Sequence, residues 1–141
     1  MKKNSLYIIL LVLLLVSCDR YKNYRLDGMW QLKTVEDISG NKSTVDTIYY
    51  SFQREAIFSL TVLIDPEYAQ YPRYGYMDMP SNDKVHILID RANNNNDNFS
   101  QFLSLSGWSS YDITFDIKND SNNNLVLFDS GNGKTFTLKK F

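Results

Sequence analysis

The sequence predicts an all-β domain in which an antiparallel, up-and-down meander of about eight strands closes into a barrel. Two observations support this prediction. Apolar and polar residues alternate with a period of two over most of the chain, which is the pattern of half-buried strands. Short segments rich in asparagine, aspartate and glycine separate most of these runs, and short connections join antiparallel neighbours. A meander of this length either closes on itself or folds into two sheets.

Each predicted strand carries apolar residues at alternate positions and ends at turn-forming residues. In chain order, the strands and their inward residues are 28–36 (Trp30, Leu32), 43–53 (Ile48, Tyr50, Phe52), 56–64 (Phe58, Leu60, Val62, Ile64), 73–79, 84–90 (Val85, Ile87, Ile89), 109–118 (Ile113, Phe115), 124–129 (Val126, Phe128) and 134–140 (Phe136, Leu138). The turn 129–133 between the last two contains Asn132-Gly133, a strong hairpin signal.

One segment has a different period. Phe99, Phe102 and Leu103 recur at the spacing of a helix face. The segment 99–105 is therefore either one short helix at an end of the barrel or a further strand.

The predicted interior is bulky. An eight-stranded barrel is only just wide enough for its own side chains or for one small ligand. The expected lining consists of Trp30, Leu32, Tyr50, Phe52, Phe58, Leu60, Ile87, Ile113, Phe115, Phe128 and Phe136. We therefore expect a mostly packed barrel, with any cavity shallow and at one mouth, and Trp30 in the core.

The N-terminus resembles a bacterial lipoprotein signal. Two lysines precede an apolar run, 6–16, which leads into Leu15-Val16-Ser17-Cys18. An apolar run of this length suits a signal peptide and is shorter than the roughly 20 residues that cross a bilayer. Cys18, the only cysteine, is then the lipid attachment site. The predicted divisions are a signal peptide, 1–17, a lipidated cysteine and polar tether, 18–27, and one domain, 28–141.

Composition excludes some classes of partner. The formal net charge is −1, and the 15 basic residues are scattered along the chain, so no basic stripe for nucleic acid is predicted. The partners we expect are the membrane, through the N-terminal lipid, and a small hydrophobic molecule, a glycan or an envelope protein. We expect the protein to be a monomer without a cofactor.

Two short motifs resemble the lipocalin-like proteins. Gly28-Met29-Trp30 resembles the Gly-x-Trp motif at the head of the first lipocalin strand, and the segment 133–141 is similar to the last strand of small bacterial lipocalin-like lipoproteins. The resemblance implies that 28–141 is one such barrel, with Gly28 and Trp30 as fold-motif residues. It also implies a location in the envelope of a double-membraned bacterium, where we expect the outer membrane to hold the anchor.

The segment 65–76 is the predicted working surface. It contains prolines, an arginine and several tyrosines, and tyrosine rings give recognition sites a large contact area with a polar tip. The candidate ligand or partner contacts are Tyr68, Tyr71, Arg73, Tyr74 and Tyr76, together with Trp108. Alternatively, these rings pack over the barrel mouth or along a strand edge, and Trp108 caps an end of the barrel.

No catalytic or metal-binding residue is predicted. His86 is the single histidine and alternates away from the buried face, and its spacing reveals neither an orienting carboxylate nor a nucleophile. A zinc site needs several histidine or cysteine ligands. Asp65 and Glu67 are the only carboxylates that we would test, for a glycosidase-like reaction.

Two functions of different kinds remain. The first is a membrane-anchored, non-catalytic binding module that uses the barrel mouth or the tyrosine segment. The second is a structural or inhibitory envelope protein whose filled barrel only presents surfaces to protein partners. An open lumen favours the first function, and a solid core favours the second.

Overall fold

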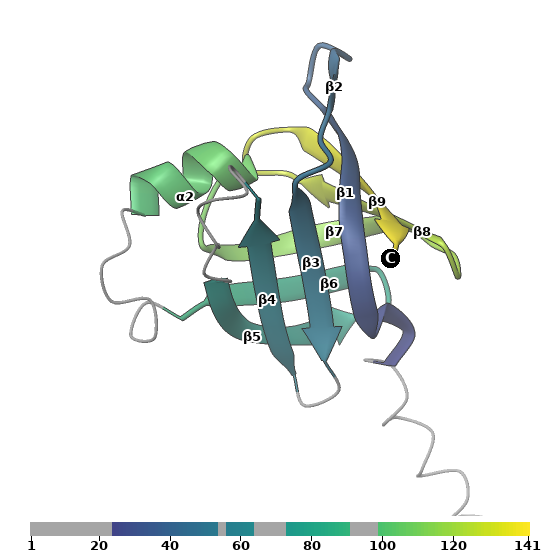
Figure 1. Ribbon diagram of the computed structural model, residues 1–141. Coiled ribbons are helices and arrows are strands. Elements are labelled where there is room, and N and C mark those ends of the chain that lie inside the picture. The colour runs from purple at the N-terminus through teal and green to yellow at the C-terminus, as the bar shows by residue number, and fades with distance from the viewer. Residues whose placement is uncertain (1–23, 54–55, 64–72, 91–98) are drawn as a thin grey trace, which may run out of the picture.

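Nine strands and one short helix make up the chain in the computed structural model, which describes residues 24–53, 56–63, 73–90 and 99–141 (Figure 1). The elements are η2 (Tyr24–Leu26), β1 (Gly28–Glu36), β2 (Lys42–Thr44), β3 (Ile48–Gln53), β4 (Ile57–Val62), β5 (Arg73–Ser81), β6 (Lys84–Ile89), α2 (Phe99–Ser106), β7 (Asp112–Asp120), β8 (Asn124–Asp129) and β9 (Lys134–Lys140).

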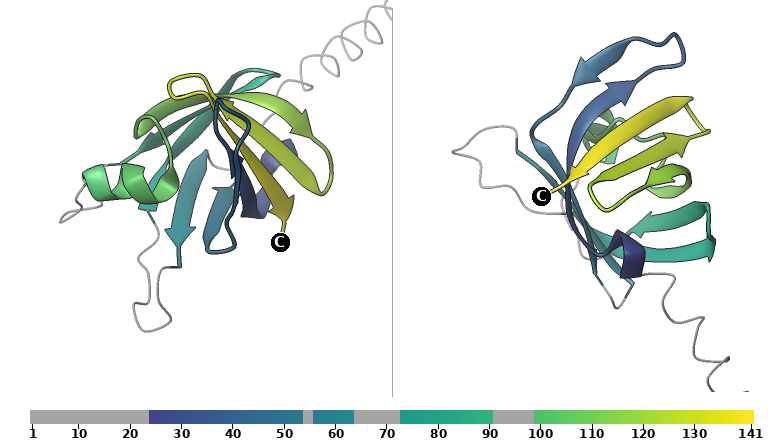
Figure 2. Two further views of the ribbon diagram at one scale, coloured as in Figure 1. Left: turned by 90° about the horizontal axis from the view of Figure 1, so that it is seen from above. Right: turned by 90° about the vertical axis from the view of Figure 1, so that its right-hand side faces the viewer.

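The strands form a closed antiparallel barrel. From β3 to β9 each strand pairs with the next one in the chain, and β1 pairs with both β3 and β9. Figure 2 shows the strands curving round until the first meets the last. The prediction of an eight-stranded up-and-down barrel is thus confirmed, and α2 decides the open question at 99–105 in favour of a helix.

One predicted strand is divided in two. The segment expected as 43–53 forms β2 and β3, which pair with different parts of β1, both on the edge away from β9: Thr44 lies opposite Thr34, whereas Tyr49 lies opposite Gln31. All three residues of β2 are exposed. Strand β2 is therefore a flap on the end of β1, outside the eight strands of the barrel (Figure 1).

Among the described residues, the core follows the predicted alternation except in β4 and β8. In β4 Ser59 is buried between Phe58 and Leu60, Val62 is only half-buried, and Ile64 lies outside the described residues. In β8 the buried residues are Leu125, Leu127 and Asp129, while Phe128 is only half-buried. The prediction that Phe128 lines the interior is wrong. Apolar residues fill consecutive positions of β8, so alternation alone does not determine which set points inward. The pairing with β9 does, because Leu127 lies opposite the buried Phe136.

The lower end of the barrel is closed by residues around the Gly-x-Trp motif. Leu26, which the sequence places in a polar tether, is fully buried, and its carbonyl accepts a hydrogen bond of 2.8 Å from Nε1 of Trp30. The ammonium of Lys140 lies 4.5 Å from the centre of the Trp30 ring and donates to the carbonyl of Asp27. Gly28 adopts a φ of 115° beside Lys140, a conformation that favours glycine. We call this arrangement the floor.

Candidate functional site

The opposite end of the barrel carries an open groove of about 680 Å³. It lies between the end of α2, the flap formed by β2, and the ends of β3 and β4 that face away from the floor (Figures 1 and 2). Its apolar lining residues are Leu32, Val35, Val45, Ile48, Val62, Leu63 and Leu105. Its polar lining residues are Ser43, Thr44, Asp46, Thr47, Ser104, Ser106 and Lys134, and Gly107 completes the lining. We call it the mouth groove.

A packed aromatic cluster lies beneath the mouth groove. The ring of Trp108 lies 5.2 Å from that of Phe115 and 5.7 Å from those of Tyr50, Phe58 and Phe102, between ring centres. Tyr50, Phe58 and Phe115 are completely buried, and Trp108 is 3% exposed. These side chains fill the barrel beneath the groove. The space for a ligand is therefore at the mouth, as the bulky interior predicts.

A hydrogen bond fixes the orientation of two rings in this cluster. Nε1 of Trp108 donates to the hydroxyl oxygen of Tyr50 over 2.6 Å. Burial raises the pKa of the Tyr50 hydroxyl well above its usual value of 10, so the group stays neutral at physiological pH. Both polar atoms are thereby satisfied inside an apolar cluster.

A buried carboxylate holds the segment that carries Trp108. Asp129 is 1% exposed, and its carboxylate accepts hydrogen bonds of 2.8 Å from the backbone and hydroxyl of Ser109 and from the backbone of Gly131. The side chain of Asn132 donates to the carbonyl of Gly107 over 2.9 Å. The β8–β9 hairpin therefore fixes the chain where α2 ends at the rim of the groove.

Lys134 gives the mouth groove a positive charge. It is half-buried, and its ammonium lies beside Gly107, at the C-terminal end of α2, where a cation is favoured. Within the described ranges, no side chain forms an ion pair with it. The one carboxylate that lines the groove, Asp46, lies 3.5 Å from the ammonium of Lys33. The groove thus combines apolar walls with one cation at its rim.

The residues predicted from the tyrosine segment do not line the mouth groove. Tyr74 and Tyr76 are 48% and 55% exposed on the outer face of β5. Arg73, at the start of β5, is half-buried and has an interaction partner. Tyr68 and Tyr71 lie outside the described residues, as do Cys18, Asp65 and Glu67.

The two tryptophans are core residues. Trp30 belongs to the floor, as expected for the fold motif. Trp108 was also a candidate contact residue, but the structure buries it among other rings. Its position therefore suits the alternative reading of an end cap and does not provide an exposed binding platform.

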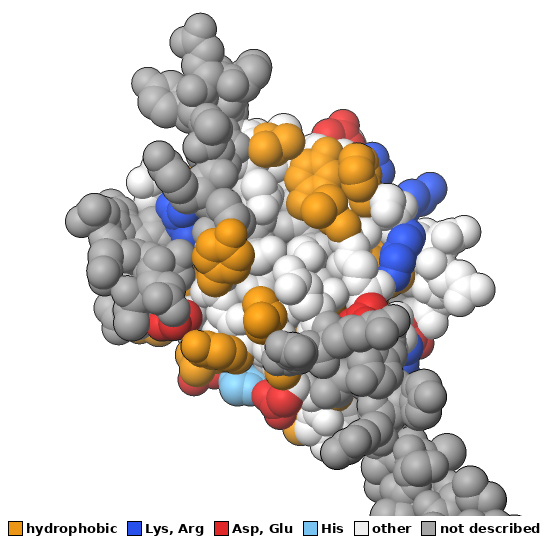
Figure 3. Space-filling view, turned by 60° about the horizontal axis from the view of Figure 1, so that its bottom comes forward, with side chains coloured by type: hydrophobic (Ala, Val, Ile, Leu, Met, Phe, Trp, Pro, Cys, Tyr) orange, Lys and Arg blue, Asp and Glu red, His pale blue; other side chains and the backbone are white. Residues whose placement is uncertain are grey.

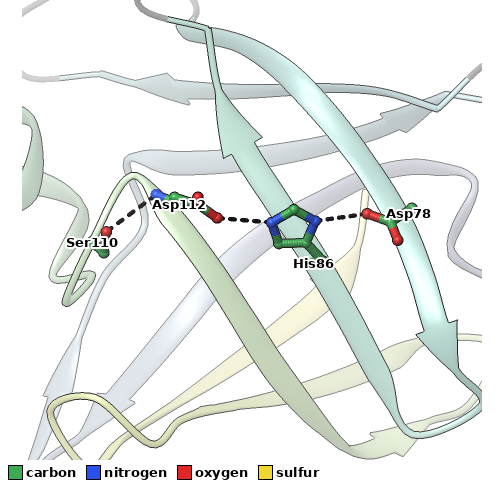
Figure 4. A network of polar contacts seen from close by, with 4 residues as sticks. All are labelled: Asp78, His86, Ser110 and Asp112. Carbon is green, nitrogen blue, oxygen red and sulfur yellow. Dashed lines mark hydrogen bonds and ion pairs between the residues drawn. The ribbon is translucent and has the colours of Figure 1, made fainter.

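No partner for His86 is predicted from the sequence, yet the structure places a carboxylate at each of its ring nitrogens (Figure 4). Nδ1 lies 2.7 Å from Asp78 on β5, and Nε2 lies 2.8 Å from Asp112 on β7. The register of three strands produces this arrangement, because β6 lies between the other two. Since both nitrogens are engaged by carboxylates, neither is available as a general base for a nucleophile.

The geometry of this triad favours a charged imidazole. Neutral imidazole has one N–H, and the second nitrogen would then direct its lone pair at a carboxylate oxygen. The hydrogen bonds to Asp112 and Asp78 accordingly raise the pKa of His86 above its usual value of 6.5.

We expect this triad to make the stability of the protein depend on pH. The pKa of His86 is higher in the folded protein than its usual value of 6.5, so protonated His86 stabilises the fold. This stabilisation is fully present below pH 6.5 and is lost as the pH rises through the pKa of His86 in the folded protein. The two aspartates are more than 60% exposed, so solvent screening keeps the contribution below about 1 kcal/mol. Urea unfolding at pH 5.5 and 8.5 measures it, as the difference in free energy of unfolding between the wild type and His86→Gln.

The single histidine also gives a direct readout. NMR titration of its imidazole is expected to give a pKa above 6.5 in the wild type and one near 6.5 in the double variant Asp78→Asn/Asp112→Asn. Equal values in the two proteins would show that the carboxylates do not hold the proton.

Two further classes of site are absent from the described part of the chain. Its histidine, aspartate and glutamate residues include no group of three or more that is suited to a metal ion. Among the same residues, no helix has the length and apolar character needed to span a bilayer.

Comparison with known proteins agrees with this architecture. A family model described as lipocalin-like domain matches residues 13–141. The crystal structure of a lipocalin-like protein from Bacteroides uniformis superposes with a TM-score of 0.69 and 24% identity, covering 83% of this chain and 99% of that one. An uncharacterized protein from Bacteroides eggerthii superposes with a TM-score of 0.67 and 20% identity, covering 82% and 99%. No curated protein matches the chain.

Proposed function

Because the chain belongs to the lipocalin-like domain family, whose fold is typically that of ligand-binding proteins, we propose that it is a non-catalytic binding protein of the bacterial cell envelope. In this proposal it is anchored by a lipid on Cys18, and it holds a small hydrophobic molecule in the mouth groove. The observation that carries the proposal is the groove itself, with apolar walls above a packed aromatic cluster.

The dimensions of the groove suit a small molecule. Ligand pockets commonly have volumes of about 300–1,000 Å³ and combine apolar walls with a few polar groups. The mouth groove, at about 680 Å³, falls within this range. Lys134 at the rim would favour a ligand with an anionic or strongly polar end, because its ammonium has no ion-pair partner among the described residues.

The position of the groove also fits an anchored protein. The described chain begins at Tyr24, at the floor, whereas the mouth groove lies at the other end of the barrel (Figure 1). A lipid on Cys18 would lie a few residues before the floor, within roughly 20 Å of extended chain. The mouth would then face away from the anchoring membrane and toward ligands in solution.

We expect the fluorescent probe 1-anilinonaphthalene-8-sulfonate to bind in the mouth groove, because it joins an apolar body to an anionic group. The full chain should enhance its fluorescence, and Leu105→Glu should weaken this binding about tenfold or more by placing a charge in the apolar wall. Fluorescence titration of the purified protein measures the affinity.

A matched control uses the other side of the barrel. Leu88 and Leu105 are both 38% exposed, but Leu88 lies on the outer face of β6. Leu88→Glu should therefore bind the probe like the wild type. Equal weakening by the two substitutions, or no effect of Leu105→Glu, would contradict the assignment of the ligand to the mouth groove.

The filled interior favours one alternative function. Among the described residues six aromatic side chains are fully buried, namely Trp30, Tyr50, Phe52, Phe58, Phe115 and Phe136. A barrel filled in this way also suits a structural or inhibitory envelope protein that presents only its surface to protein partners. That function predicts no saturable binding of the probe by the wild type.

A further inference from the structure

The outer face of the barrel carries a second surface that the mouth groove does not explain. It is formed by Ile57 on β4, Tyr74, Tyr76 and Asp78 on β5, His86 and Leu88 on β6, and Asp112 on β7. We call it the outer aromatic face. In Figure 3 the pale-blue histidine lies next to red acidic side chains, with orange side chains beside them.

Strand pairing aligns these side chains in two neighbouring rows. Tyr76 lies opposite Ile57 on one side and Leu88 on the other, and Leu88 lies opposite Asp112. In the next row Asp78 lies opposite His86. From Tyr74 to Asp78 the surface is about 14 Å long, at roughly 3.4 Å per residue.

The apolar part of this surface is open to solvent. Tyr74, Tyr76 and Leu88 are 48%, 55% and 38% exposed. Large side chains on the outside of a small barrel contribute little to its core, and clustered exposure of this kind marks an interaction surface. The two tyrosines lie two residues apart on one strand, so their rings are on the same face.

The polar part of this surface consists of carboxylates that are held in place. Each of Asp78 and Asp112 binds His86 through its Oδ1 atom. Within the ranges that the structure describes, their Oδ2 atoms have no hydrogen-bond partner. His86 therefore fixes two acceptors at the edge of the aromatic surface, so less side-chain entropy is lost when a ligand binds.

We infer that the outer aromatic face binds a neutral oligosaccharide. A sugar ring presents apolar C–H groups on its face and hydroxyl donors at its edge. The tyrosine rings match the first feature, and the free carboxylate oxygens match the second. The triad has two carboxylates and one imidazole, so its net charge is negative whether or not His86 is protonated, which disfavours acidic sugars and an anionic membrane surface.

A lysine on the same strand as His86 does not change this choice. Lys84, two residues from His86 on β6, lies 2.5 Å from Asp116, so its charge is neutralised locally. The inference is independent of the proposed ligand in the mouth groove, because the two sites share no residue.

The test uses the full chain in a detergent that contains no sugar, with isothermal titration calorimetry. The probes are the neutral hexasaccharides maltohexaose, cellohexaose, xylohexaose and hexa-N-acetylchitohexaose, with hexagalacturonate as the acidic comparison. We expect at least one neutral hexasaccharide to bind, and Tyr76→Ala to weaken it about tenfold. Asp78→Asn/Asp112→Asn should weaken it by a similar factor.

Tyr49→Ala is the matched control. Tyr49 lies on the outer face of β3, where its ring contacts Phe141, so the substitution should leave the affinity unchanged. A second readout needs no variant: the NMR signals of the His86 imidazole should shift as the bound hexasaccharide reaches saturation.

Absence of binding by all four neutral probes overturns the inference. So does preferential binding of hexagalacturonate, or equal weakening by Tyr49→Ala and Tyr76→Ala. The proposed function is tested separately, by the binding of anilinonaphthalenesulfonate to the mouth groove.

Discussion

Replacing Trp108 by alanine is expected to lower the free energy of unfolding by about 3–5 kcal/mol, the usual cost of removing a large buried aromatic side chain. The substitution leaves a cavity between the rings of Tyr50, Phe58, Phe102 and Phe115. It also leaves the buried hydroxyl of Tyr50 without the Trp108 donor. Urea unfolding of the full chain, followed by far-ultraviolet circular dichroism, measures the change.

Two conservative variants separate packing from hydrogen bonding. Tyr50→Phe keeps the ring but leaves Nε1 of Trp108 without its acceptor, which should cost about 1–3 kcal/mol. Trp108→Phe keeps part of the ring volume, so it should fall between Tyr50→Phe and Trp108→Ala. A change below 1 kcal/mol for Trp108→Ala would show that the ring is not part of the core.

Replacing Trp30 by alanine is expected to cost a similar amount, about 3–5 kcal/mol, but for a different structural reason. Trp30 forms the floor, where it binds the carbonyl of Leu26 and lies beneath the ammonium of Lys140. Without the Trp30 ring, the fully buried Leu26 loses the hydrogen bond to its carbonyl. Because the chain has two tryptophans, the fluorescence of the remaining Trp108 follows unfolding in this variant.

Trp30→Phe and Met29→Ala serve as controls. Trp30→Phe retains an aromatic ring but removes the donor to Leu26, so about 1–2 kcal/mol should be lost. Met29 is adjacent in sequence and 44% exposed, and its replacement should change stability by no more than about 0.5 kcal/mol. Equal losses for Met29→Ala and Trp30→Ala would exclude a special role for the floor.

The repeating pattern of the sequence was sufficient to predict the barrel. Strands β1 and β9 lie at the predicted residues, 28–36 and 134–140. Trp30 and Leu32 in β1, and Phe136 and Leu138 in β9, alternate with polar residues, and a glycine lies at or just before the start of each strand. Alternation was insufficient in β8, where residues 125–128 are all apolar, so the sequence does not show whether Leu125 and Leu127 or Val126 and Phe128 point inward. Leu26 was missed because a single apolar residue in a polar segment has no period at all.

The polar groups of the two surfaces were harder to predict than the fold. His86, Asp78 and Asp112 come together only through the register of three strands, and register depends on pairings that one sequence does not reveal. Asp129 was expected only as a turn residue, yet the hairpin and the segment before β7 bury it together. In both cases the contacts join residues that are 8 to 26 positions apart.

The mouth groove is closed from below. Leu26, Trp30 and Lys140 close the lower end of the barrel, and the rings around Trp108 fill the barrel beneath the groove. In the proposed binding mode a molecule in the groove therefore leaves only into the solvent at the mouth, and a competitor for the same space binds only after it has left. Exchange would then proceed at the dissociation rate of the resident molecule, whatever the concentration of its rival.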